Sequence, residues 1–127
     1  MTDESVLNRN ETIELLKTFS DEQKSNYMLQ RMIEDYLRKL NLPSMAKVFE
    51  KTGEKEEAGV LTKTHVRLLQ CMVKDYYLAI GSNFDESVKS RGITIVDGSL
   101  SDLEQECVDK LLTDYCKAVN IALSSII

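Results

Sequence analysis

Residues 28–53, MLQRMIEDYLRKLNLPSMAKVFEKTG, decide how the rest of this chain is interpreted. Leu29, Ile33, Leu37 and Leu40 recur at helical spacing, and charged residues fill the positions between them. This pattern predicts a helix with one apolar stripe and a charged remaining surface.

A second and shorter helix follows the corner at Asn41-Leu42-Pro43 and is expected to end at Gly53. Ala46 and Phe49 are among its apolar residues. Two short helices bury too little surface to be stable alone. The stripe therefore needs a partner, which is either the rest of the chain or a second copy of the protein.

Residues 28–53 resemble the lissencephaly homology (LisH) motif, a two-helix unit through which proteins of that family form homodimers. The matching positions are the apolar Leu and Ile, the aromatic-Leu pair, the small Ala and the Phe. The family usually has Gly at the corner, where this chain has Asn41. The resemblance implies a dimer and a role as a subunit of a larger assembly. The expected interface residues are Leu29, Ile33, Tyr36, Leu37, Leu40, Ala46 and Phe49.

The composition is that of a globular helical protein. The 127 residues include 43% hydrophobic and 29% charged residues, with one Pro and five Gly. The net charge of −5 disfavours direct contact with nucleic acid or an anionic membrane surface. No apolar run is long enough to span a bilayer.

Cysteine usage indicates an intracellular protein, either cytoplasmic or nuclear. The chain has three cysteines, Cys71, Cys107 and Cys116, an odd number that cannot all pair within one chain. They lack the CxxC spacing, and the sequence shows no secretory signal. We therefore expect reduced and buried thiols.

Helical patterns cover most of the chain, which predicts an all-α bundle of five to six helices with a LisH-like helical hairpin near its N-terminus. Residues 1–9 are expected to be a flexible terminus, and 10–57 to hold the N-terminal helices. Residues 60–127 are expected to form a C-terminal helical unit packed with the first as one domain. Capping residues predict helix starts at Ser20, at Thr62 or Thr64, and at Ser101.

Motifs for catalysis, cofactors and metals are missing from the sequence. His65 is the only His and has no Cys three or four residues away, which argues against zinc. Neither a calcium-binding loop nor a phosphate-binding or hydrolase motif can be found. We therefore expect no enzymatic activity, no cofactor, no metal and no catalytic residue.

A second surface for a partner protein is suggested by aromatic residues in the later helices and by the C-terminal isoleucines. Its residues would be Tyr76, Tyr77, Tyr115, Ile126 and Ile127, although core packing alone is enough to explain the tyrosines. The sequence thus predicts a non-enzymatic subunit that binds itself through residues 28–53 and other protein subunits through a helical platform. The alternative is a monomeric helical adaptor that binds an amphipathic helix of a partner in an apolar groove.

Overall fold

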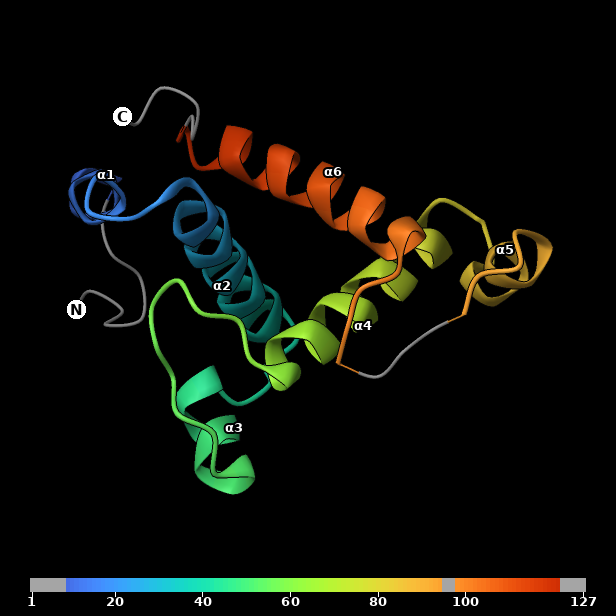
Figure 1. Ribbon diagram of the computed structural model, residues 1–127, viewed down its shortest axis with the longest axis horizontal. Coiled ribbons are helices and arrows are strands. Elements are labelled where there is room, and N and C mark those ends of the chain that lie inside the picture. The colour runs from blue at the N-terminus through green and yellow to red at the C-terminus, as the bar shows by residue number, and fades with distance from the viewer. Residues whose placement is uncertain (1–8, 95–97, 122–127) are drawn as a thin grey trace. The chain divides into compact units, whose positions relative to one another are not determined.

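The computed structural model describes residues 9–94 and 98–121, and its regular elements are helices (Figure 1). They are α1 (Arg9–Leu16), α2 (Asp21–Lys39), α3 (Met45–Thr52), α4 (Lys63–Ala79), α5 (Phe84–Ser90) and α6 (Asp102–Ala118). Within the described residues the only β feature is one isolated bridge between Glu57 and Val60. The all-α prediction is confirmed. Except for Arg9, the expected flexible terminus lies outside the described residues.

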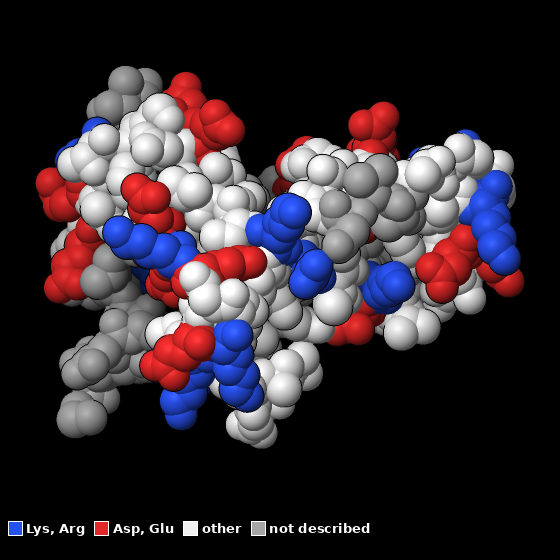
Figure 2. Space-filling model, turned by 60° about the horizontal axis from the view of Figure 1, so that its bottom comes forward, with Lys and Arg blue, Asp and Glu red and all other residues white. Residues whose placement is uncertain are grey.

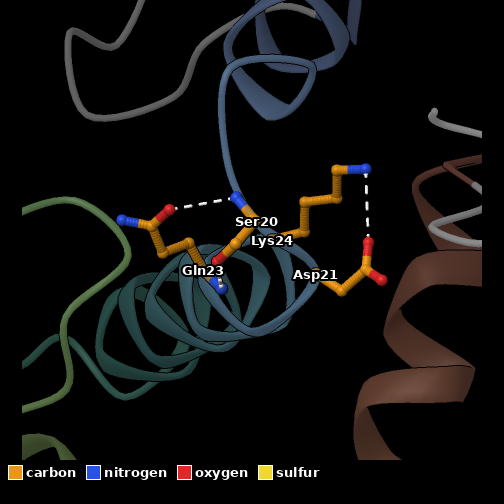
Figure 3. Close-up of polar contacts among 4 residues, drawn as sticks. All are labelled: Ser20, Asp21, Gln23 and Lys24. Carbon is orange, nitrogen blue, oxygen red and sulfur yellow. Dashed lines mark hydrogen bonds and ion pairs between the residues drawn. The ribbon is translucent and has the colours of Figure 1, made fainter.

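Capping boxes begin α2 and α6, as the sequence predicts, and α4 begins after Thr62, one of its two predicted starts. At the start of α6 the Ser101 hydroxyl accepts from the Glu104 backbone N–H at 3.3 Å, and Oε1 of Glu104 accepts from the Ser101 backbone N–H at 2.8 Å. At the start of α2 the Ser20 hydroxyl accepts from the Gln23 backbone N–H at 3.3 Å, and the Gln23 side chain accepts from the Ser20 backbone N–H at 3.0 Å (Figure 3). Thr62 caps α4 in the same way, with Nδ1 of His65 accepting from the Thr62 backbone N–H at 2.9 Å. Each of these capping boxes satisfies backbone N–H groups that would otherwise be unpaired at the start of its helix.

The corner after α2 is closed by Asn41, whose φ of 56° is left-handed. The N–H groups of Asn41 and Leu42 donate to the carbonyls of Arg38 and Leu37, at 3.1 and 2.9 Å. This is the hydrogen-bond pattern of a Schellman motif, in which Gly is the usual residue and Asn the common substitute. Asn41 therefore adopts the left-handed backbone conformation for which Gly is the usual residue at the end of a helix.

Two compact units divide the chain, and the division falls inside α6. The first unit contains residues 9–61 and 112–121 of the described chain, and the second contains 62–111 apart from 95–97. The expected division put all of 60–127 together. Residues 112–121 instead pack with the N-terminal helices.

The core of the first unit explains that placement. Leu16 of α1 and Met28 of α2 form one buried cluster with Cys116 and Ile121. Residues that lie far apart in the sequence thus share one apolar core. Cys116 and Ile121 cover apolar side chains of α1 and α2.

α3 begins later than the position of Pro43 suggests, since Ser44 is the N-cap and Met45 the first helical residue. Gly53 ends the helix in the left-handed conformation, as predicted, with a φ of 76°. In Figure 1, α3 lies beyond the end of α2 and not along its length. The two helices therefore meet at their corner, in contrast to the lengthwise pairing that the word hairpin implies.

Candidate functional site

The residues predicted for dimerisation divide into buried and exposed sets. Leu29, Ile33, Leu37 and Phe49 are buried within the single chain, and Ile33 has no exposed surface. Tyr36 is half-buried, whereas Leu40 and Ala46 are exposed. The apolar stripe of α2 is thus mostly core, and the accessible part of the predicted set lies at and after the corner.

The corner itself presents two leucines to solvent. Leu40 is 50% exposed and Leu42 is 48% exposed. Most residues of their size in the described chain are far less accessible. We call Leu40, Leu42 and Ala46 the corner surface. Leu42 could have been found from the sequence, because it follows the last residue of the stripe at a turn.

A carboxylate from α2 fixes the start of α3 behind this surface. Oε1 of Glu34 accepts from the backbone N–H of Met45 at 2.9 Å, whereas the N-cap Ser44 makes no capping bond with its own side chain. An acceptor with negative charge is favoured at a helix N-terminus, where unpaired N–H groups gather. Glu34 therefore holds the corner in one geometry.

Glu56 belongs to the segment that follows α3. Partial burial raises the pKa of its carboxyl group, and the nearby charge of Glu34 raises it further. The loop is held to α2 by Gln30, whose amide nitrogen donates to the carbonyls of Glu57 and Val60 at 2.9 Å. Two side chains of α2 therefore hold the segments on either side of α3: Glu34 binds the start of α3, and Gln30 binds the loop that follows it.

Tyr76 and Tyr77 lie together in the second unit, where they line a hollow of about 230 Å³. We call it the tyrosine hollow. Its other lining residues are Ile80, Leu103, Glu106, Cys107 and Lys110. Of the other residues predicted for this surface, Tyr115 belongs to the first unit, and Ile126 and Ile127 lie outside the described residues.

Aromatic contacts fix one wall of the tyrosine hollow. The Tyr77 ring meets the Phe84 ring edge to face, with centroids 5.2 Å apart, and meets the Tyr76 ring at 6.2 Å. Phe84 is buried, so α5 supports this wall from behind. Leu103, Cys107 and Lys110 were not predicted for this surface, because the sequence does not show which side of α6 faces α4.

The lining of the hollow carries one cation, Lys110, and one anion, Glu106. Nζ of Lys110 lies 6.0 Å from the centre of the Tyr76 ring, at the outer limit for a cation–π contact. Burial raises the pKa of the Tyr77 hydroxyl, and Cys107 acts to raise it further, whereas Arg91 acts to lower it. The charges of Lys110 and Glu106 therefore balance at the edge of an otherwise apolar lining.

Tyr115 joins a polar network in the first unit. Its hydroxyl donates to Oδ2 of Asp35 at 2.6 Å, while Oδ1 of Asp35 accepts from Arg38 at 3.3 Å. Arg31 donates to the hydroxyl of Thr12, which is completely buried. The network connects α1, α2 and the end of α6, so Tyr115 has a structural role.

Comparisons with known proteins do not assign the chain to a family. No family model matches the chain, and neither a search of curated proteins nor a search of solved structures finds a match. The LisH resemblance thus remains an expectation.

The described residues offer neither a metal cluster nor a membrane span. Among them, no group of three or more His, Cys, Asp or Glu side chains could hold a metal ion. None of the described helices combines the length and the apolar character needed to cross a bilayer. In Figure 2, acidic and basic side chains are interspersed over the described part of the drawn face.

His65 and the three cysteines lie in different surroundings. His65 is buried and caps α4 through Nδ1. Cys107 and Cys116 are buried, as expected, but Cys71 is exposed, so that expectation was wrong for Cys71. The reason is the helical period: Cys71 lies midway between the buried residues Leu69 and Val73, and so faces the other side of α4.

Proposed function

We propose that this protein is a non-enzymatic interaction subunit of a larger assembly in the cytoplasm or nucleus. It would pair with a second copy of itself through the α2–α3 segment and bind another protein through residues 62–111. The observation that carries the proposal is the corner surface, where Leu40 and Leu42 are each about half exposed. Exposed apolar side chains that lie close together favour an interface.

The LisH resemblance supports the choice of a second copy as the partner. The corner Asn41 adopts the left-handed conformation that a glycine of the motif would supply. Because Leu29, Ile33 and Leu37 are buried within the chain, the proposed contact uses the corner surface and the exposed sides of α2 and α3. This differs from an interface centred on the stripe.

The area of the proposed dimer contact can be compared with that of known interfaces. A stable interface buries roughly 800 Å² on each partner, and two half-exposed leucines supply only part of that area. The rest must come from polar and charged side chains around them. We therefore expect a dimer of modest affinity, with Leu40 and Leu42 at its centre.

Sedimentation velocity tests this dimer. We expect the wild-type chain to shift from monomer to dimer between about 1 μM and about 1 mM, the range in which modest interfaces associate. Leu42→Asp should give a folded monomer throughout, because a charge at the centre of the contact loses its hydration on association. A wild-type chain that stays monomeric over the whole range would overturn the proposal.

Two further variants distinguish the corner surface from the rest of the chain as the dimer contact. Leu78→Asp changes a leucine that is 72% exposed in the second unit and should leave the dimer intact. Ile33→Asp places a charge at a fully buried position and should unfold the chain. If Ile33→Asp gave a folded monomer instead, the stripe would form the interface.

A monomeric helical adaptor is the second candidate, and the tyrosine hollow favours it. Tyr76, Tyr77 and Ile80 surround an apolar depression next to exposed charges, as expected for a site that takes one side chain of a partner helix. In the sedimentation experiment, this candidate alone predicts a monomer at every concentration.

A further inference from the structure

A second hollow lies beside the first turns of α2, where the loop that follows α3 meets that helix. Its volume is about 440 Å³, inside the range of about 300–1,000 Å³ that is typical of ligand sites. We call it the loop hollow. Its lining residues, which all belong to the first unit, are Glu22, Gln23, Asn26, Gly59, Val60 and Leu61.

Hydrogen bonds hold the two walls of the loop hollow together. Nδ2 of Asn26 donates to the carbonyl of Gly59 at 3.1 Å, and Oε1 of Gln30 accepts from the backbone N–H of Gly59 at 2.9 Å. Gly59 has a φ of 82° and lies so close to α2 that an added Cβ would be 3.2 Å from the Cβ of Gln23. The loop is thus fixed against α2, and a ligand would meet a site that is already formed.

The charge of the lining has one sign. Glu22 is the only charged residue of the lining, and it is exposed. Its neighbour Asp21 is paired with Lys24 at 3.6 Å (Figure 3). The positive end of the α2 dipole amounts to roughly half an elementary charge, which is less than the full charge of Glu22. The loop hollow therefore favours a cation.

The other lining residues offer apolar surface and hydrogen-bonding groups. Val60 is 42% exposed, so apolar surface is accessible at the hollow. Nδ2 of Asn26 donates to the loop, which leaves Oδ1 as an acceptor. Oε1 of Gln23 accepts from Ser20, which leaves Nε2 as a donor on the side away from Ser20 (Figure 3). A ligand with an aliphatic stem and a cationic head meets both kinds of group.

We infer that the loop hollow binds an arginine side chain of a partner protein, with the guanidinium group on the Glu22 carboxylate and the aliphatic stem over Val60. A planar guanidinium can bind a carboxylate through two parallel hydrogen bonds and still donate to a neighbouring oxygen, here Oδ1 of Asn26. The stem of an arginine covers apolar surface while its charged head stays in water.

A protein ligand is favoured over a free amine by Gln23, because its Nε2 can donate to a carbonyl of a peptide backbone. This site goes beyond the proposed function, since it uses neither the corner surface nor residues 62–111. It adds a contact for a basic segment to a chain whose net charge is −5.

An NMR titration of the full chain tests the site. The probe is an acetylated and amidated pentapeptide with one central arginine between alanines. We expect saturable shifts of the amide signals of Asn26, Gly59 and Leu61, with a Kd of about 1 mM for this single anchor. The same peptide with citrulline, which lacks the charge, should bind about threefold to fivefold more weakly, as for the loss of an exposed ion pair.

Butylguanidinium distinguishes a protein ligand from a free amine. It keeps the charge and the stem but has no carbonyl to accept from Gln23, so it should bind at least about twofold more weakly than the arginine peptide. Equal or tighter binding of butylguanidinium would contradict the assignment to a protein.

Two variants test the residues of the site. Glu22→Gln should weaken the arginine peptide about threefold to fivefold and leave the citrulline peptide unchanged. Val60→Ser should weaken both peptides about threefold, because the stem loses apolar contact. Asp85→Asn is the matched control: Asp85 is the exposed second residue of α5, as Glu22 is of α2, and lies outside the lining. It should leave both affinities unchanged, and the amide spectrum of each variant checks its folding.

Three results would overturn the inference: no saturable shift at the lining, equal affinity for the arginine and citrulline peptides, or equal losses from Glu22→Gln and Asp85→Asn. Equal losses would indicate general attraction to an acidic chain. Leu42→Asp keeps this site apart from the proposed dimer, because it should abolish the dimer and leave the peptide affinity unchanged. A dimer without peptide binding refutes the loop hollow alone, and peptide binding without a dimer refutes the corner alone.

Discussion

The hydroxyl of Tyr115 donates a 2.6 Å hydrogen bond to Oδ2 of Asp35, across 80 positions of sequence. It attaches the last turn of α6 to the C-terminal part of α2, where Arg38 already holds the other oxygen of Asp35. A hydrogen bond to a charged acceptor is stronger than a neutral one. This bond is a polar link between residues 112–121 and the N-terminal helices.

Tyr115→Phe should lower the free energy of unfolding by about 1–2 kcal/mol, because Asp35 loses its short donor. Urea denaturation followed by circular dichroism measures the change. Asp35→Ala and the double variant complete a mutant cycle. If the two single losses simply added, the bond would contribute nothing specific.

Stability should fall as the pH rises above 10. Burial raises the pKa of Tyr115 above its ordinary value of 10.0, and the hydrogen bond to Asp35 raises it further. The unfolded chain therefore ionises first, so the stabilisation is complete below pH 10 and is lost as the pH rises towards the folded pKa. Urea midpoints on either side of pH 10 test this, and Tyr115→Phe should flatten the dependence.

Asn41→Gly should be at least as stable as the wild type, and Asn41→Ala should lose about 1 kcal/mol, because alanine is strained at positive φ. Thermal unfolding ranks the three chains. The same pair of substitutions at Lys39, inside α2, is the matched control and should give the opposite order, with Gly below Ala. The same order at both positions would contradict the role of the corner.

Glu34→Ala should weaken the start of α3 by about 1 kcal/mol, a usual value for a lost cap. Hydrogen exchange at the Met45 amide should speed up, whereas the Phe84 amide in α5 should not change. Glu34→Gln keeps an acceptor oxygen and should show a smaller effect. Unchanged exchange at Met45 in Glu34→Ala would show that the cap is unimportant.

One thiol per chain should react rapidly with a water-soluble disulfide reagent. Cys71 is exposed, whereas Cys107 and Cys116 are buried, and burial raises the pKa of both buried thiols. Absorbance of the released thiolate counts the fast groups, and denaturant should reveal the other two. Cys71→Ser should remove the fast phase; a fast phase that survives would place Cys107 or Cys116 at the surface.

Local chemistry made much of the fold predictable. Ser20, Gly53 and Ser101 mark helix ends through contacts within a few residues, and the structure uses each as the sequence predicts. Apolar periodicity likewise placed Ile33 and Leu37 on one stripe, and both are buried. Such rules do not depend on the rest of the chain.

Contacts between distant segments were not predictable in this way. The spacing of Tyr76 and Tyr115 suggested one shared surface, yet the structure assigns them to different units. Leu40 continues the periodic stripe but follows the last residue of α2, where the chain turns, and remains half exposed. Sequence spacing alone does not show which side of a helix another segment covers.

The division inside α6 has a consequence for biosynthesis. Residues 62–111 leave the ribosome before Cys116 and Ile121, which cover Leu16 and Met28 in the first unit. The first unit therefore completes its core only after the residues of the second unit have been made. A nascent chain that is stalled after residue 111 should expose that apolar surface to chaperones, and the full-length chain should release them.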